Sequence, residues 1–284
     1  MINNYSYNIF SNSIYLYDSF LLDGVGEALY RITKAVNNRE KIIIYGSYDV
    51  DGITSVSLLM LILKYLNADV EYYIPDIIEN EEIFNSSVIE NHIKFLGAGL
   101  IITVGCGINS FNEVEICREL GIDVIITDYH TPSEKLPSAI IINPNQKQCR
   151  YPFKQLNAVG ITYKLAYAIA EHYHVQCIEK YLDLVAIGIV SSNIPIVDEN
   201  LAMLEKGIYC LSISNNYGIN AITKINKINH VDYNSLKALA SILMPKINAV
   251  GRMDDARIVV ELFTTSDIER AEQIAKYLKK NNRE

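Results

Sequence analysis

The chain has 284 residues, of which 50% are hydrophobic and 20% are charged, and its formal net charge at pH 7 is −8. This length and composition exclude a disordered polypeptide and allow one large domain or two modest ones. No apolar run approaches the ~18 residues that span a bilayer, and the polar start MINNYSYN does not resemble a signal peptide. A soluble cytoplasmic protein without membrane contact is therefore predicted. The acidic balance excludes a general binder of polyanions, so any nucleic-acid contact must come from a local basic groove.

Cysteine does not form a recognisable pattern. The five residues are Cys106, Cys117, Cys149, Cys177 and Cys210, without a CxxC pair or a Cys/His cluster. This spacing does not suit a zinc site, and an odd number does not suit a disulfide framework. Unpaired, mostly buried thiols are expected.

Short apolar runs alternate with helical stretches in the first half of the chain. The runs are KIIIYG (41–46), VEYYI (70–74), LIITVG (100–105), DVIITD (123–128) and AIIINP (139–144). Helical patterns lie between them near residues 53–67, 85–96 and 112–120. This alternation predicts an α/β fold with a mainly parallel sheet and helices on both faces. Right-handed crossovers then bring the carboxyl ends of the strands to one edge, where such sheets bind ligands.

The second half of the chain has mainly helical periodicity. Helices are predicted over residues 160–175, 178–190, 201–211, 235–243, 254–263 and 267–284. We therefore divide the chain into an N-terminal segment packing on the core (1–40), an α/β core (41–157), a helical part of the same domain (158–265) and the start of a connecting helix (266–284).

Acidic and imidazole side chains follow two of the predicted strands. Asp49 and Asp51 follow the first, and Asp128 and His130 follow the fourth. Each residue alone is more often a helix-capping aspartate or a loop histidine. Their joint placement at strand ends predicts a shared rim. Carboxylates and imidazole suit Mn²⁺ or Mg²⁺, and two such ions about 3.5–4 Å apart can clamp a phosphodiester.

Eight segments carry a family resemblance. They are IIIYGSYDVDGITS, YYIP, LIITVGCGI, GIDVIITDYH, LPSAIIINP, CRYPFKQLNAVGITYKL, DLVAIGIVSSNIPI and PKINAVGRM. In order and spacing they resemble the blocks of RecJ-type single-stranded-DNA exonucleases of the DHH superfamily, over residues 41–284. The resemblance implies the DHH-domain fold, phosphodiester hydrolysis dependent on Mn²⁺ or Mg²⁺, single-stranded DNA as partner, and a role in DNA repair and recombination.

The same resemblance implies that the metal site is incomplete. Gly105, Tyr129 and Ser192 stand where the family has metal-binding Asp, His and Asp, and Ser47 replaces a supporting Asp.

Few of the metal-binding residues that the resemblance implies remain in this sequence. Asp49, Asp51 and His130 match metal ligands, and Asp128 and His130 match catalytic positions. Because each hard dication prefers about six ligands, we expect one weakly held Mn²⁺ or Mg²⁺ at most, and none in a pseudoenzyme.

A basic element near the end of the chain is the candidate nucleic-acid contact. Asn248, Gly251 and Arg252 resemble a family element that contacts substrate phosphate, and Lys246 stands where the family usually has Arg. Lys164 extends this into a basic track, together with Arg150 and Lys154, although each lysine alone is equally a solvated surface charge. The chain also has 20 Tyr, which suit base stacking or, more simply, core packing.

The leading interpretation is a RecJ-like protein without catalysis that binds single-stranded DNA or a replication or repair partner. The first alternative is an active exonuclease with a reduced metal site, in which Asp76 or Glu82 fills a missing position. The second is a small-molecule phosphoesterase, an activity that the resemblance also allows. The family continues into a second domain with a Gly-rich, His-containing motif, which this chain is expected to lack.

Overall fold

Five parallel strands form the sheet of the computed structural model, which describes residues 15–75, 83–245 and 255–281. The strands are β1 (Lys41–Gly46), β2 (Val70–Tyr73), β3 (Ala98–Val104), β4 (Asp123–Thr127) and β5 (Ile140–Ile142). Their order is β2-β1-β3-β4-β5, and every neighbouring pair is parallel. The predicted α/β class and parallel sheet are confirmed.

One helix precedes the first strand, others lie between strands, and the rest follow the last strand to the end of the described chain. The helices are α1 (Val25–Asn38), α2 (Val50–Tyr65), α3 (Ser86–Asn91), α4 (Phe111–Glu119), α5 (Ala158–His172), α6 (Leu182–Ser191), α7 (Asp198–Ser212), α8 (Tyr217–Ile225), α9 (Tyr233–Leu243), α10 (Asp255–Thr264) and α11 (Ile268–Asn281), with 3-10 helices at Ser19–Leu21, Ile93–Leu96 and Ile178–Tyr181. The sequence analysis predicts no helix over α1 or α8.

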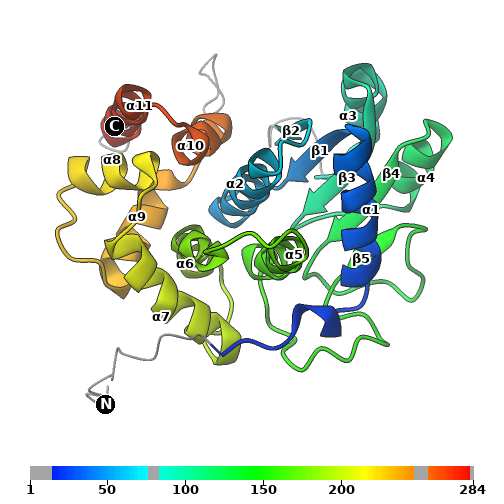
Figure 1. Cartoon of the computed structure of the whole chain (residues 1–284), viewed down its shortest axis with the longest axis horizontal. Coiled ribbons are helices and arrows are strands. Elements are labelled where there is room, and N and C mark those ends of the chain that lie inside the picture. Colours follow the sequence, from blue (N-terminus) through cyan, green and yellow to red (C-terminus); the bar gives the residue numbers. More distant parts are fainter. Residues whose placement is uncertain (1–14, 76–82, 246–254, 282–284) are drawn as a thin grey trace.

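Both faces of the sheet are covered by helices, as predicted. Alternate residues of β1 point to opposite sides, so Ile42 and Ile44 belong to one apolar cluster and Ile43 and Tyr45 to another. Helices α1, α2 and α5 cover the first face, and α3 and α4 cover the second (Figure 1).

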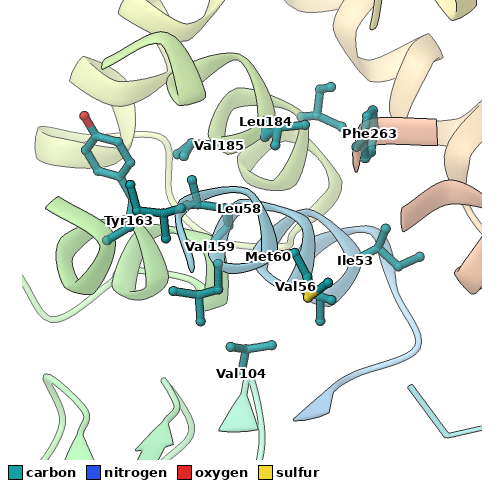
Figure 2. Packing of buried hydrophobic residues seen from close by; sticks show 14 of the residues in the cluster. Ile53, Val56, Leu58, Met60, Val104, Val159, Tyr163, Leu184, Val185 and Phe263 are labelled. Carbon is teal, nitrogen blue, oxygen red and sulfur yellow. The ribbon is translucent and has the colours of Figure 1, made fainter. Parts of the chain in front are cut away.

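Helix α2 is buried around its whole circumference. Thirteen of its sixteen residues are buried, and Figure 2 shows it between Val104 of β3 on one side and Leu184 and Val185 of α6 on the other. A helix that is apolar on all sides needs cover on all sides. Its polar residues fit there because they bond within the helix, as when Ser57 Oγ donates to the Ile53 carbonyl at 2.7 Å.

The remaining helices supply that cover. Helix α6 contacts α2, α7 and α9, and α10 contacts both α2 and α8. Figure 1 shows α6 to α11 on the side of α2 away from the sheet.

The proposed division of the chain at residues 40, 157 and 265 stays a prediction. In the described part of the chain, we find no helix with both the length and the apolar character that crossing a membrane requires.

A buried carboxylate joins two parts of the helical layer. Asp183, in the first turn of α6, accepts hydrogen bonds from Ser214 Oγ and from its own helix at Leu184 N, both at 2.7 Å. Burial raises the pKa of Asp183 to about 6, against the smaller lowering effects of these hydrogen bonds and of Lys180.

This raised pKa makes stability depend on pH. The folded state holds the Asp183 proton more tightly than the unfolded state, so the free energy of unfolding should fall as pH rises from about 4 to about 7. Asp183→Asn keeps the bond from Leu184 N and can donate to Ser214 Oγ. We expect it to exceed the parent in stability by up to about 3 kcal/mol at pH 7.5 and to match it near pH 4, measured by urea unfolding. Exposed Asp23→Asn is the control, and a gain independent of pH would contradict this account.

Candidate functional site

The carboxyl ends of β1, β3 and β4 meet at one edge of the sheet. Strand β1 has β2 on one side and β3 on the other, so successive crossovers leave in opposite directions there, which is where open parallel sheets form a ligand-binding crevice. The ends of α5 and α6 also reach this edge. We call the following residues the rim: Ser47, Asp49, Asp51, Gly105, Asp128, Tyr129, His130, Asn157 and Ser192.

The Asp51 carboxylate is surrounded by hydrogen-bond donors. Its Oδ1 accepts from Asn157 Nδ2 at 3.0 Å and from Val159 N at 2.8 Å. Its Oδ2 accepts from Ala158 N at 3.1 Å and lies 3.0 Å from Ser192 Oγ. A carboxylate has about four acceptor positions, so these partners use all of them.

These contacts make Asp51 a cap for the start of α5. The first N–H groups of a helix have no partner within the helix, and a carboxylate there is stabilised by the helix dipole. Asn157, the residue before α5, completes the arrangement, because its Oδ1 accepts from Gly160 N at 3.1 Å while its Nδ2 also lies 3.1 Å from Ser192 Oγ. Asp51 therefore joins α2, α5 and α6.

The charge state of Asp51 reflects opposing influences. Burial and the nearby charge of Asp49 raise its pKa to about 7, while the hydrogen bonds from Val159, Ser192 and Ala158 lower it. The hydrogen bonds from α5 and Ser192 thus stabilise the ionised carboxylate, whereas burial and Asp49 favour the protonated form.

Asp49 has a different position. It precedes α2 in extended conformation, and its Oδ1 accepts from Gly52 N at 2.7 Å, so it is a helix N-cap. Its side chain is exposed at the rim.

Asp128 is buried and, like Asp51, surrounded by donors. Its Oδ2 accepts from Ile108 N at 3.0 Å, and its Oδ1 accepts from Tyr129 N at 2.7 Å and His130 N at 3.1 Å. His130 Nδ1 lies 2.7 Å from the same Oδ1. This last contact raises the pKa of His130, against the lowering effect of burial.

Tyr129 and His130 form a stacked pair. Their ring centroids are 4.3 Å apart and the rings are inclined by 27°. Burial and the charges of Asp51, Asp49 and Asp128 raise the pKa of Tyr129 to about 12, so its phenol stays protonated. Because these charges act on one phenol, Asp49, Asp51 and Asp128 lie near one another, and their role as a ligand set stays a prediction.

The backbone at Gly105 suits the glycine that is present. Its φ is +73°, a left-handed conformation that side chains rarely adopt, and a Cβ would lie 3.1 Å from Ala158 Cβ and 3.3 Å from Ser47 Oγ. A metal-binding carboxylate at this position would require a strained backbone.

The rim does not fit a two-metal centre. The buried carboxylates Asp51 and Asp128 are occupied by protein donors, and Gly105, Tyr129 and Ser192 offer neither carboxylate nor imidazole. Within the described ranges, no group of three or more His, Cys, Asp or Glu side chains is arranged to hold a metal ion.

The prediction that Lys164 contacts nucleic acid is wrong. The side chain is 1% exposed, and its Nζ forms an ion pair with Glu199 and donates to the Tyr17 carbonyl at 2.7 Å. Glu199 also accepts from Tyr151 Oη at 2.5 Å and from Tyr17 N at 2.8 Å. The network joins the segment around Tyr17 to α5 and α7, and burial lowers the pKa of Lys164.

Of the other residues predicted to contact nucleic acid or metal, some are exposed in the structure and some lie outside the described residues. Arg150 and Lys154 are exposed, although Lys154 Nζ also donates to the carbonyls of Pro144 and Cys149 at 2.8 and 2.7 Å. The remaining predicted residues lie outside the described residues: Asp76, Glu82, Lys246, Asn248, Gly251 and Arg252.

Asn157 is the site residue that the sequence analysis missed. It lies within the segment CRYPFKQLNAVGITYKL, directly before α5 and three residues before the helix predicted over 160–175, and an Asn in that place is a cap signal. Its second role, as a donor to Asp51, depends on residues 106 positions apart and has no local signature.

Comparison with known proteins agrees with this architecture. Residues 41–189, more than half of the chain, match the family described as DHH family, N-terminal domain. The single-stranded-DNA-specific exonuclease RecJ of Bacillus subtilis (strain 168) is 38% identical over 274 residues, covering 94% of this chain and 34% of that protein. RecJ of Escherichia coli (strain K12) is 32% identical over 274 residues, covering 90% of this chain and 47% of that protein. The chain spans about a third to a half of the length of these curated relatives.

Solved structures of RecJ share the fold. A crystal structure of exonuclease RecJ bound to manganese has a TM-score of 0.81 and 26% identity, covering 92% of this chain and 66% of that chain. RecJ from Thermus thermophilus in complex with Mn²⁺ has a TM-score of 0.78 and 25% identity, covering 92% of this chain and 38% of that chain.

The two aspartates after β1 should differ in their effect on stability. Asp51→Ala leaves buried donors of α5 without an acceptor, and we expect it to lower the free energy of unfolding by about 3 kcal/mol or more. Asp49→Ala removes one exposed N-cap bond and should lower it by about 1 kcal/mol. Urea unfolding without divalent metal measures both. Equal losses would contradict the capping role of Asp51.

The buried ion pair gives a second stability prediction. Glu199→Ala leaves Lys164 buried without its carboxylate, so we expect a loss of about 3–5 kcal/mol in the free energy of unfolding. Glu205→Ala, on the exposed side of the same helix, should change it by less than about 0.5 kcal/mol. A similar result for both variants would show that the Lys164–Glu199 pair contributes little.

Proposed function

This chain belongs to the DHH family and is of the RecJ type, and we propose that it binds single-stranded DNA without hydrolysing it. In this proposal the rim, where the resemblance places a metal centre, is a cluster held together by hydrogen bonds between protein groups. A replication or repair protein as a further partner stays a prediction.

The observation that carries the proposal is the set of donors around Asp51. Asn157, Ala158, Val159 and Ser192 use the acceptor positions of its carboxylate. A cation bound to Asp51 would displace these donors and uncap α5. The residue expected to be a central ligand thus supports the local structure.

The chemistry of the missing ligands supports the same conclusion. Hydrolysis by two metals needs both ions held close together, so that one activates water while both stabilise the developing charge. Gly105, Tyr129 and Ser192 leave too few charged donors for two hard dications, each of which prefers about six ligands. A single, weakly held Mn²⁺ or Mg²⁺ on Asp49 or His130 would not supply that chemistry.

Support for DNA as the ligand comes from the relatives. The RecJ proteins of Bacillus subtilis and Escherichia coli are described as specific for single-stranded DNA. The chain spans only part of the length of these proteins.

The proposal is tested with end-labelled single-stranded DNA and Mn²⁺. We expect no release of labelled nucleotide by the intact protein or by Asp51→Ala, while the intact protein still retains the DNA on a filter. Thermal unfolding adds an independent measurement, because an ion at a hundredfold excess over its Kd would stabilise the fold by about 2.7 kcal/mol. We expect Mn²⁺ to produce no such shift.

Two results would overturn the proposal. Nucleotide release that requires Asp51 would identify an active exonuclease with a reduced metal site. Turnover of dinucleotides but not of long strands, again dependent on Asp51, would identify a small-molecule phosphoesterase. Asp49→Asn, purified in the same way, controls for a contaminating nuclease, whose activity would be the same in all preparations.

A further inference from the structure

The stacked rings of Tyr129 and His130 lie at the edge of the sheet where a ligand would bind. The His130 side chain is 51% exposed, and Tyr129 lies behind it, half-buried, at a centroid distance of 4.3 Å. One face of the His130 ring is covered by Tyr129. The exposed fraction of His130 therefore belongs to the rest of the ring.

Several hydrogen bonds fix this pair in place. His130 Nδ1 lies 2.7 Å from Asp128 Oδ1. Asn143 Nδ2 donates to the His130 carbonyl at 2.9 Å, and Asn145 Nδ2 donates to the Tyr129 carbonyl at 2.7 Å. Ring and backbone are thus both held, so little conformational entropy is lost when a ligand stacks on the pair.

Electrostatics favour a base over a phosphate at this position. Asp49, Asp51 and Asp128 all act on Tyr129, so the rim carries several acidic groups in a small space. Without a bound dication, these three acidic groups outnumber the one imidazole of the rim, so a phosphate gains little there. The face of a nucleobase is uncharged and stacks on aromatic rings regardless of its sequence.

We propose that the Tyr129–His130 pair is a nucleobase-stacking site, on which one base of a single strand packs against the open face of His130. The site rests on the proposed function, because it takes the bound strand to be DNA, and it names the contact that replaces metal-bound phosphate. The Tyr at position 129, which removes a ligand expected by resemblance, then supplies the ring that backs His130.

The test uses 2-aminopurine, placed at successive positions in oligothymidylate. The chain has no Trp, so the fluorescence of this base reports stacking without interference. A second series of oligonucleotides carries an abasic residue at each of the same positions. We expect one position at which 2-aminopurine is quenched and at which the abasic residue weakens binding about fivefold or more.

Variants connect this position to the pair. His130→Gln keeps a donor for Asp128 but removes the ring, and it should abolish both the quenching and the abasic penalty. His130→Phe and Tyr129→Phe keep the rings and should preserve both. Tyr30→Ala and Phe95→Ala remove aromatic rings that are 75% and 77% exposed elsewhere, and they should change neither measurement.

The possible results distinguish a failure of the stacking site from a failure of the proposed DNA binding. Equal binding of abasic and normal oligonucleotides, or a penalty that persists in His130→Gln, would overturn the stacking site while leaving DNA binding intact. Failure of the intact protein to bind any oligonucleotide would overturn both. Loss of the penalty in His130→Gln with rescue by His130→Phe supports the site.

Discussion

The enclosure of α2 determines how the rest of the molecule is arranged. This helix is apolar on every side, and the sheet can cover only one of them, so α5, α6 and α10 must cover the others. The enclosure extends to the first turn, which brings Asp51 into the interior. A buried carboxylate needs donors. The donors come from the start of α5 and the end of α6, which are two of the helices that cover α2. The packing of the core therefore also determines the hydrogen bonding of the rim.

As a consequence, the rim contains hydrogen bonds that connect three helices. Asp51 from α2, Asn157 before α5 and Ser192 after α6 bond to one another, and each satisfies polar groups that burial would leave unpaired. Ser192 is suited to this because its small hydroxyl can donate or accept; its single proton lies within reach of both Asp51 Oδ2 and the Gly188 carbonyl. In this arrangement, residues that resemble catalytic machinery satisfy the hydrogen bonding of buried groups.

Features that depend on neighbouring residues could be predicted from the sequence. The five strands follow from apolar β-branched runs, and the clustering of Asp49, Asp51 and Asp128 follows from the rule that parallel strands end at one edge. Helices α1 and α8 were missed although each is amphipathic, with apolar residues buried along one side. Lys164 was misread as a surface charge because its partner Glu199 is 35 residues away on another helix. Likewise, the donors to Asp51 come from 106 to 108 residues along the chain, and only the fold brings them together.

The left-handed backbone at Gly105 has an evolutionary consequence. An aspartate there would add a strain of about 1–2 kcal/mol before any metal could compensate for it. An aspartate in place of Ser192 would likewise set a second negative charge against Asp51, whose oxygen is now 3.0 Å from a neutral hydroxyl. Either of these two substitutions made alone is therefore unfavourable in the present structure. Restoring carboxylates at these two positions would therefore have to be accompanied by changes in the residues around them.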